Sequence, residues 1–514
     1  MPRAIRSGRK RWSPTWNKIT VNNSLYLIFI FYGLLSSSCN EEKDIQANEW
    51  SILLKGLGSF SSPRATDLNG DSVKDIVLGA GKVEFQPTDS AVVALDGRNG
   101  QLLWVASARD QIFGSPLFLD ITGDAVPEVI IGGRAAELMA LEGSSGKVIW
   151  EYFPEGDTAD AAEHQLYNFY NPQPIRDLDN DGTDDLLVSN GGYVKAPPGE
   201  INRPAGKLML ISGKTGILLA EAYMPDGKET YMSCVAFERN NETYVIYGSG
   251  GERIPGKLYL TTLTQIRQGS LKNSMILAES DTKGFIAPPV LADITQDGIN
   301  DIVVNTVDGR TLAIDGESYE TLWKFSLPDT EVYCSLAVGH FDQDDVPDFF
   351  TNYGIGVFPN LMRSAQVALS GADGSLISID SLGSFHYGSP VAYDTNGDGL
   401  DEVFFHVNEY IPGVAKNVLK MFDFAQDTVI NITTSANGAN IAGTPLLDDL
   451  DHDGSLDIVI VHETNPFDLF SIDAKVGLAV KIIPTDNKLL QPVSWGSYMG
   501  NHYDGMYHTN TPSF

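Results

Sequence analysis

One nine-residue pattern recurs along this chain and constrains its fold more than any other feature. Its clearest copy runs from Asp177 to Asp185, with acids at positions 1, 3, 5 and 9, a glycine at position 6, and the apolar run Leu186–Val188 directly after it. Oxygen-bearing side chains around a glycine turn are typical of calcium loops, because Ca²⁺ takes roughly six to eight oxygen ligands. An EF-hand would continue to a glutamate at position 12 between two helices. Here a strand-like run follows position 9, so the pattern predicts a calcium loop between two strands.

Copies of this pattern occupy most of the chain. They start at residues 67, 120, 177, 293, 340, 394 and 449, so the period is about 53 residues and the interval from 177 to 293 holds two periods. In the middle of that interval, Ser233–Phe237 and Tyr244–Gly248 keep strand-like residues but have lost the acids. The sequence therefore predicts eight repeats, of which seven carry a calcium loop and several bind an ion.

The predicted calcium ligands are the oxygen-bearing side chains at positions 1, 3, 5 and 9 of each loop. One loop has His340 at position 1, so its ligands start at position 3. The full set is Asp67, Asn69, Asp71, Asp75, Asp120, Thr122, Asp124, Glu128, Asp177, Asp179, Asp181, Asp185, Asp293, Thr295, Asp297, Asp301, Asp342, Asp344, Asp348, Asp394, Asn396, Asp398, Glu402, Asp449, Asp451, Asp453 and Asp457.

Each repeat divides into four short strands. In the second repeat, Phe113–Asp120 leads into the loop, Val129–Gly133 leaves it, and Leu138–Glu142 and Lys147–Trp150 complete the unit. Four-stranded units repeated eight times without helical periodicity are typical of a β-propeller. We therefore expect an all-β fold, an eight-bladed propeller over residues 49–485, with the calcium loops between the first and second strands of most blades.

Two family resemblances support this fold. The residues Phe113-Gly114, Asp120 and Gly132-Gly133 resemble the FG-GAP and VCBS-type calcium repeats. The segments Ala94–Trp104, Ala140–Trp150 and Ala313–Trp323 resemble the tryptophan-docking repeats of quinoprotein (PQQ-type) propellers. Enzymes of the PQQ type also carry a vicinal disulfide beside the quinone. No two cysteines are adjacent in this chain, so no PQQ is expected.

The N-terminus predicts the cellular location of the protein. Residues 1–38 combine a basic start with the apolar run Leu25–Leu35 and resemble a lipoprotein signal peptide, with Cys39 as the lipidated residue and 39–48 as an acidic tether. This start resembles that of surface lipoproteins of Bacteroidetes-type bacteria. We therefore expect a protein anchored to the outer membrane of a Gram-negative bacterium by this lipid only. The alternative is an ordinary signal peptide with a chance cysteine. A net charge of −32 excludes nucleic acid as a partner, and a monomer is expected.

Both ends of the repeat region bear on how the ring closes. Glu49–Leu54 and Lys475–Ile483 each have the character of a last fourth strand, so we expect one of them to lie outside the propeller. Residues 486–514 are rich in aromatic residues and glycine and are expected to form a packed C-terminal cap. The alternative is an exposed arm that binds a ligand.

The loop face opposite the acidic loops is the expected place of function. Basic residues recur there before the third strand, at Arg134, Arg203, Arg253, Arg310, Arg363 and Lys416, and suit an anionic glycan such as a uronate-bearing polysaccharide. The alternative is that they pair with neighbouring acids. An aromatic also recurs seven residues before five of the loops, at Phe60, Phe113, Tyr170, Tyr333 and Tyr387, with Phe285 one place off. Packing between blades is the favoured role of these rings, and stacking on sugars is the alternative.

No catalytic motif accompanies these repeats. We therefore expect a calcium-stabilised cell-surface module that binds a carbohydrate or a protein. One alternative is a carbohydrate-active enzyme of the polysaccharide-lyase type, with His164, His386, Tyr170 or Tyr387 as the base. A further alternative is a scaffold lipoprotein of envelope assembly.

Overall fold

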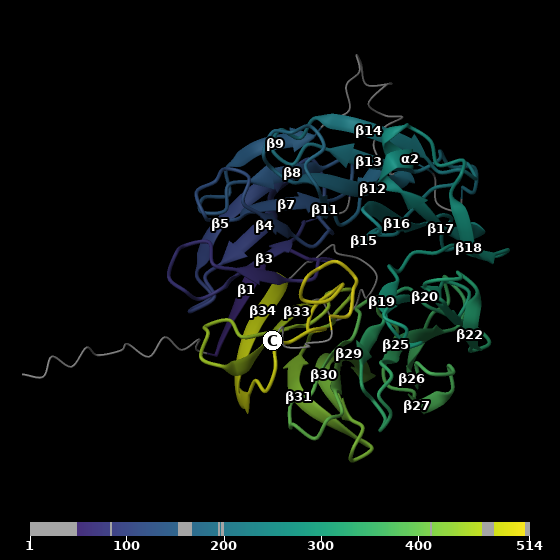
Figure 1. Cartoon of the computed structure of the whole chain (residues 1–514). Coiled ribbons are helices and arrows are strands. Elements are labelled where there is room, and N and C mark those ends of the chain that lie inside the picture. Colours follow the sequence, from purple (N-terminus) through teal and green to yellow (C-terminus); the bar gives the residue numbers. More distant parts are fainter. Residues whose placement is uncertain are drawn as a thin grey trace, which may run out of the picture. The chain divides into compact units, whose positions relative to one another are not determined.

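Eight antiparallel sheets follow one another round a ring in the computed structural model (Figure 1). The predicted all-β, eight-bladed propeller is thereby confirmed. The residues that the structure describes are 49–82, 85–152, 167–193, 196, 200–411, 414–464 and 477–508. The expected signal peptide 1–38, Cys39 and the tether up to residue 48 lie outside the described residues, as does His164.

The first four blades are consecutive in the chain, and their strands run from the centre of the ring outward. They contain β2 (Arg64–Thr66), β3 (Asp75–Gly79), β4 (Thr88–Leu95) and β5 (Leu102–Ala108); β6 (Leu117–Leu119), β7 (Glu128–Gly132), β8 (Leu138–Leu141) and β9 (Val148–Tyr152); β10 (Tyr167–Phe169), β11 (Gln173–Ile175), β12 (Asp185–Tyr193), β13 (Lys207–Ile211) and β14 (Leu218–Tyr223); and β15 (Val235–Arg239), β16 (Glu242–Gly248), β17 (Gly256–Thr262), the short helix α2 (Leu263–Arg267) and β18 (Met275–Ser280).

The other four blades complete the ring, and the last of them takes its outer strand from the start of the chain. They contain β19 (Val290–Ala292), β20 (Asp301–Thr306), β21 (Arg310–Ile314) and β22 (Thr321–Ser326); β23 (Thr330–Glu331), β24 (Ala337–Gly339), β25 (Asp348–Ile355), β26 (Arg363–Leu369) and β27 (Leu376–Asp380); β28 (Val391–Tyr393), β29 (Glu402–Ile411), β30 (Val414–Asp423) and β31 (Thr428–Ala436); and β32 (Leu446–Asp448), β33 (Ser455–Glu463), β34 (Gly477–Lys488) and β1 (Trp50–Lys55).

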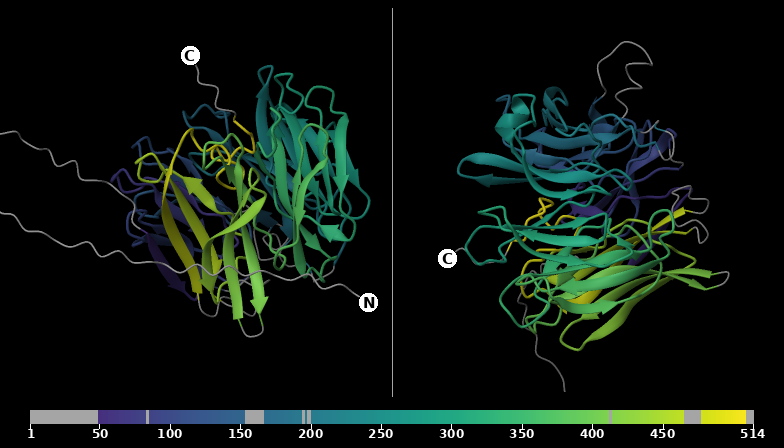
Figure 2. Two further views of the ribbon diagram at one scale, coloured as in Figure 1. Left: turned by 90° about the horizontal axis from the view of Figure 1, so that it is seen from below. Right: turned by 90° about the vertical axis from the view of Figure 1, so that its right-hand side faces the viewer.

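The pattern of apolar residues explains why these segments form stacked blades. Second and third strands such as β7 and β8 are buried along their whole length, because a blade is covered on both faces by its neighbours. Fourth strands such as β9 are mostly exposed at the rim, with a buried residue such as Trp150 facing the neighbouring blade. In the side views the strands of the green and yellow blades run nearly along the axis of the ring (Figure 2).

A tryptophan on the outer strand of one blade docks on the next blade. The Nε1 of Trp104 on β5 donates to the carbonyl oxygen of Gly143 at 2.7 Å, in the turn between the third and fourth strands of the second blade. Gly146 in the same turn has a positive φ of 69°, and a Cβ there would overlap the indole ring. The same arrangement recurs at Trp50 with Gly97 and Gly100, Trp150 with Gly213 and Gly216, and Trp323 with Gly371 and Gly374. The predicted tryptophan docking is therefore present, and it includes the junction between the last blade and the first.

Strands from both ends of the chain close the ring. β1 pairs antiparallel with β34, with Trp50 opposite Ile482 and Lys55 opposite Gly477. The expectation that one of the two segments lies outside the propeller is wrong. Because β34 takes the third place in the last sheet, the fourth place is free for β1. Beside this junction, the buried carboxylate of Glu463 accepts a hydrogen bond from the Ser59 N–H.

The segment after β34 crosses the middle of the ring, where its yellow trace lies in Figure 1. Trp495 is only 2% exposed, and its Nε1 donates to the carbonyl oxygen of Leu336 beside the first strand of the sixth blade. The backbone of this segment also bonds to Leu291 of the fifth blade and Leu447 of the eighth. Its contacts with first strands from several blades fill the channel from the side of the acidic loops.

The acidic loops lie between the first and second strands, as predicted. In all seven, the acid at position 9 is buried and accepts a hydrogen bond from the N–H at position 2. Asp185, for example, accepts from Leu178 at 2.7 Å and from Gly213 at 3.2 Å, so it ties the loop to the outer turn of its own blade. Position 9 therefore has a structural role in addition to its predicted role as a ligand. Among the residues that the structure describes, no helix is long and apolar enough to cross a lipid bilayer.

Removing a docked tryptophan should destabilise the propeller. Trp104→Ala should lower the free energy of unfolding by about 3–5 kcal/mol, because it leaves a cavity and an unpaired carbonyl at the blade junction. The measurement is urea denaturation. Leu102→Ala on the same strand is the control, since Leu102 is 51% exposed and should tolerate the change. If both variants lose the same free energy of unfolding, the docking contact does not stabilise the propeller more than an exposed side chain does.

The closing junction should also carry a pH dependence. Burial raises the pKa of Glu463 to about 8 from its ordinary value of 4.5, so between these values the unfolded chain releases a proton that the folded state keeps. The stability that Glu463 contributes is therefore present below pH 4.5 and is lost as the pH rises to about 8. Glutamine does not titrate, so the Tm of the wild type minus that of Glu463→Gln should fall from pH 5 to 8 and then level off. A difference that is flat or rises over this range would show that Glu463 is ionised in the folded state.

Candidate functional site

A pocket of about 690 Å³ opens at the centre of the ring. Its walls come from the residues that precede the first strands, whereas the acidic loops follow those strands, so it lies on the face opposite the acidic loops. Tyr498 of the C-terminal segment also contributes to the lining. The pocket is therefore a funnel that the C-terminal segment closes at its base.

One repeat position supplies a residue from every blade to this pocket. Seven of these residues stand seven places before a loop, and the eighth belongs to the repeat without acids. They are Phe60, Phe113, Tyr170, Tyr231, Ile286, Tyr333, Tyr387 and Ala442. The rings also pack on one another, with centroid distances of 5.4 Å for Phe113–Tyr170 and 5.3 Å for Tyr333–Tyr387. The recurring aromatics therefore pack between blades and face the pocket at the same time.

Counting from the loops identified five of these residues and missed the others. Tyr231 was missed because its repeat has no acid from which to count. Phe285 is fully buried, and Ile286 takes the position in its blade. A signal for Tyr231 was present in the sequence, since Ser233 follows it at the distance at which Ser115 follows Phe113.

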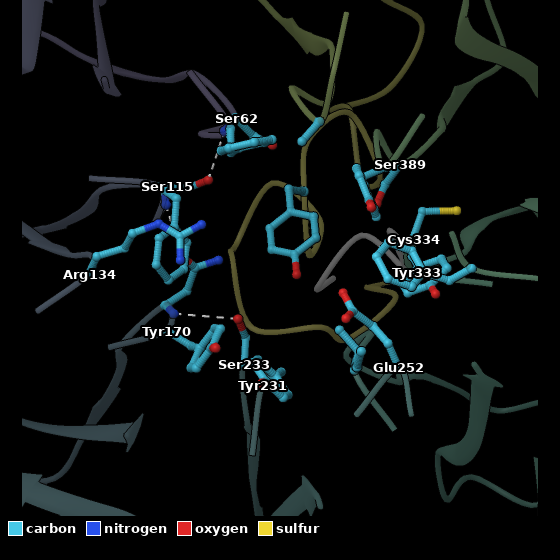
Figure 3. A pocket seen from close by; sticks show the side chains of 18 of the residues that line it. Ser62, Ser115, Arg134, Tyr170, Tyr231, Ser233, Glu252, Tyr333, Cys334 and Ser389 are labelled. Atoms are coloured by element: carbon cyan, nitrogen blue, oxygen red, sulfur yellow. Dashed lines mark hydrogen bonds between the residues drawn. The ribbon is translucent and has the colours of Figure 1, made fainter. Parts of the chain in front are cut away.

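A belt of hydrogen bonds holds the layer below the aromatics. The Ser62 N–H donates to the Ser115 hydroxyl at 3.2 Å, the Ser115 N–H to the Asn171 side-chain oxygen at 2.8 Å, and the Asn171 N–H to the Ser233 hydroxyl at 3.4 Å (Figure 3). Further round the ring, the Ser335 N–H donates to the Ser389 hydroxyl at 3.1 Å. Each of these bonds joins neighbouring blades, so the belt fixes the diameter of the pocket.

Two charged side chains reach the pocket from opposite walls (Figure 3). The Arg134 guanidinium lies 5.6 Å from the ring centroid of Phe113, and its Nε donates to the side-chain oxygen of Gln111. On the other side, Glu252 lies in the loop between the second and third strands of the fourth blade. The surrounding protein raises the pKa of Glu252.

A smaller hollow of about 370 Å³ adjoins the central pocket. The two share Tyr231, Glu252, Phe358 and Pro359, and together they form one groove that leads from the centre toward the loops of the third and fourth blades. Arg203 and Arg253 line the outer part.

The predicted row of basic residues is not one continuous surface. Arg134 lines the central pocket, and Arg203 and Arg253 line the smaller hollow. Arg203 donates to Glu229 at 3.3 Å and to the Tyr231 hydroxyl at 2.6 Å. Arg310 pairs with a neighbouring aspartate at 2.7 Å, and Arg363 donates to a serine hydroxyl at 2.9 Å. The structure thus brings three of the five arginines to the groove.

Of the side chains considered as bases, the three that the structure describes do not have the properties of a base. Burial raises the pKa of the Tyr170 and Tyr387 phenols well above neutrality, so both rings stay protonated. His386 is 4% exposed, burial lowers its pKa to about 4, and its Nδ1 accepts the Gly388 N–H. Burial also raises the pKa of the Cys334 thiol in the pocket wall. These groups suit hydrogen bonding and packing rather than proton abstraction.

The acidic loops have the shape and the oxygen atoms that calcium needs. Gly182 at position 6 has a φ of 90°, and the Asp177 carboxylate accepts the N–H groups of Asn180 and Gly182. In four loops, three carboxylates place an oxygen within 4.8 Å of one another: Asp177, Asp179 and Asp185; Asp342, Asp344 and Asp348; Asp394, Asp398 and Glu402; and Asp449, Asp451 and Asp453. The donors fit a hard cation, and calcium binding stays a prediction.

Comparison with known proteins finds a matching family model and similar vertebrate chains. Residues 66–360 match the family model described as the FAM234A/B beta-propeller. Protein FAM234B of Mus musculus is 23% identical over 367 residues, which are 64% of this chain and 54% of the relative. Protein FAM234B of Gallus gallus is 24% identical over 335 residues, 59% of this chain and 50% of the relative. The chain thus spans about half the length of the curated relatives it matches.

Solved structures share the fold. A europium-containing methanol dehydrogenase superposes with a TM-score of 0.57 at 11% identity, over 85% of this chain and 92% of that one. The quinohemoprotein alcohol dehydrogenase ADHIIG from Pseudomonas putida HK5 has a TM-score of 0.54 at 13% identity, over 86% and 77%. At this identity the likeness shows the propeller fold alone. The expected absence of PQQ stays a prediction.

Two sequence interpretations are corrected by these findings. The predicted location, a lipid anchor in the outer membrane of a Gram-negative bacterium, is wrong, because the matching relatives are Protein FAM234B of mouse, chicken and human. That interpretation depended on a basic start, a short apolar run, and Cys39 with the acidic residues that follow it. The second correction concerns the repeat family. The family model that matches is the FAM234A/B beta-propeller, which differs from the predicted FG-GAP and VCBS repeats. The comparisons bear out the propeller and not those repeat families.

Calcium should stabilise the folded chain if the loops bind it. A ligand that binds only the native state at a hundredfold excess over its Kd adds about 2.7 kcal/mol per site. EDTA should therefore lower the Tm, and Asp177→Ala should reduce the gain in Tm on adding CaCl₂. The control is Asp281→Ala, an exposed acid directly after β18, in the blade that has no acidic loop. A Tm that is the same with EDTA and with calcium would mean that the loops are structural turns only.

Proposed function

Since this chain belongs to the FAM234A/B β-propeller family, we propose that it is a binding module whose central pocket holds the end of a carbohydrate ligand. The observation that carries the proposal is the ring of six aromatic side chains, from Phe60 to Tyr387, at one repeat position around the pocket. Aromatic faces pack on the C–H faces of sugar rings, and tyrosine adds a hydroxyl for a hydrogen bond. The family and the fold are compatible with many ligands, so the proposal depends on the pocket.

The dimensions of the groove favour an elongated ligand with one end in the centre. A volume of about 690 Å³ lies in the range of roughly 300–1,000 Å³ that small-molecule sites occupy. Tyr498 lies in the pocket wall on the C-terminal segment, which closes the base, so a ligand enters from one side only. The adjoining hollow of about 370 Å³ has room for the next unit of a chain.

The polar groups of the groove suit oxygen-rich ligands. Arg134 in the pocket and Arg253 in the hollow present N–H groups that bind sugar hydroxyls or a uronate carboxylate. Arg203 is already bonded to Glu229, so we assign it a part in shaping the hollow. On this proposal, calcium in the acidic loops holds the opposite ends of the first strands and has no contact with the ligand.

Binding without catalysis is the activity that the pocket chemistry favours. General-base catalysis needs a side chain with a pKa near neutrality. Among the described residues proposed for that role, Tyr170 and Tyr387 have a raised pKa, and His386 is buried and does not line the pocket. We therefore do not assign lyase chemistry to this site.

A glycan array with the whole chain, followed by calorimetry on each ligand found, tests the proposal. Tyr387→Ala should weaken binding about tenfold, because a stacked ring in a desolvated pocket contributes on the order of 1–1.5 kcal/mol. Tyr223→Ala is the control, since Tyr223 is 54% exposed on β14 and does not line the pocket. An array without ligands, or equal affinity of the two variants, would refute a carbohydrate site at the centre of the ring.

A further inference from the structure

Glu252 stands where the central pocket meets the smaller hollow, and it lines both. Its carboxylate points into the pocket from the wall opposite Arg134 (Figure 3). It belongs to the loop between β16 and β17, in the one blade without an acidic loop. Any ligand that extends from the pocket into the hollow therefore passes this carboxylate.

The other two acids near this junction already have partners. Lys283 donates to Glu331 at 2.6 Å, and the Tyr333 hydroxyl donates to the second oxygen of Glu331 at 2.6 Å. Arg203 pairs with Glu229 at 3.3 Å. Both carboxylates are thereby neutralised within the protein.

Glu252 differs from these two acids. Over the part of the chain that the structure describes, its carboxylate accepts no hydrogen bond and has no cation within 4.0 Å. The neighbouring Arg253 does not reach it, because the Arg253 guanidinium lies over the Phe358 ring at 5.1 Å. Glu252 is exposed in the groove, so its carboxylate is accessible to a ligand that enters there. An accessible carboxylate that no protein cation neutralises can form an ion pair with a cationic ligand.

The surroundings of Glu252 favour a cationic ligand. Phe358 and Tyr231 line both hollows beside it, and Tyr333 and Tyr387 line the central pocket. Aromatic faces attract cations, and protonated phenols leave the carboxylate as the charged acceptor. The described residues form no cluster of three metal-ligating groups at this place, so a metal ion would lack ligands there. An organic amine needs only one carboxylate and the aromatic faces.

We propose that Glu252 is an amine-recognition group and that the ligand of this groove carries a protonated amino group at the junction of the two hollows. The inference deepens the proposed function, on which it rests, by naming an amino sugar as the carbohydrate class. The ammonium group donates to the Glu252 carboxylate, and its substituents pack against the Phe358 and Tyr333 rings. An N-acetylated or neutral sugar lacks this charge and leaves Glu252 without a partner.

The first test uses two matched pairs of probes on the whole chain at pH 6, where the amines are charged. One pair is the β-1,4-linked glucosamine dimer and its N-acetylated form, and the other is benzylammonium and benzyl alcohol. By calorimetry, each amine should bind about tenfold more tightly than its neutral partner, as expected for a hydrogen bond to a charged group. Glu252→Gln should remove that preference. Equal binding within both pairs, a preference that survives in Glu252→Gln, or no binding of any probe would overturn the inference.

The two pairs separate this inference from the proposed function. Binding of benzylammonium through Glu252 together with an empty glycan array would retain the amine site and reject the carbohydrate. Sugars that bind equally well with and without an acetyl group would retain the carbohydrate and reject the amine site.

A stability measurement distinguishes a ligand-binding acid from a structural one. Glu252→Gln should leave the Tm unchanged, because Glu252 is exposed and makes no hydrogen bond or ion pair with the other described residues. Glu331→Gln is the matched control, since it breaks a pair with Lys283 whose side chains are 15% and 1% exposed, and it should lower the Tm. An equal fall in Tm for both variants would make Glu252 a structural residue and overturn the proposal.

Discussion

The contact on which this ring depends is a tryptophan indole seated on a glycine turn of the next blade. At four junctions the indole N–H bonds to a glycine carbonyl, and a second glycine in the turn leaves room for the ring. A flat side chain between two outer edges sets the angle at which neighbouring sheets stand. The junction between the last blade and the first uses the same contact as three other junctions, once β1 has completed the last blade. The closure places equivalent residues of all blades around one centre, and the pocket is a result of that symmetry.

The repeats allowed much of this architecture to be predicted. A fixed spacing between acidic loops implies the number of blades, and the apolar runs after each loop imply the second strands. The aromatic position around the pocket was also visible, because it can be counted from the loops. Tyr231 was not, since its repeat has lost the acids. The partner of Arg203 was not visible either, because Glu229 lies 26 residues away and reaches it only through the packing of a loop on the next blade. Charge pairing depends on neighbours in space, and one sequence does not contain them.

The same limit explains why Glu252 did not stand out in the sequence. In an acidic chain one more glutamate carries no signal, and its difference from Glu229 and Glu331 appears only when their partners are known. The order of strands in the last blade was hidden for a related reason. β34 and β1 are both plausible outer strands, and only the sheet order shows that they are neighbours. The wrong prediction of location came from a short resemblance near Cys39. The similarity to vertebrate FAM234B proteins extends over more than half of the chain.

The pairing of β1 with β34 has a consequence for how the chain folds during synthesis. Ser59 and Glu463 touch across a separation of 404 residues. At a translation rate of about 5–20 residues per second, β1 waits on the order of 20–80 s on the ribosome before its partner strand is made. During that time the first blade has an open side, and an unpaired strand edge promotes association with other chains. Contacts of such long range also make folding slow. The seven blades that precede the junction are therefore the part that must remain soluble while the ring is incomplete.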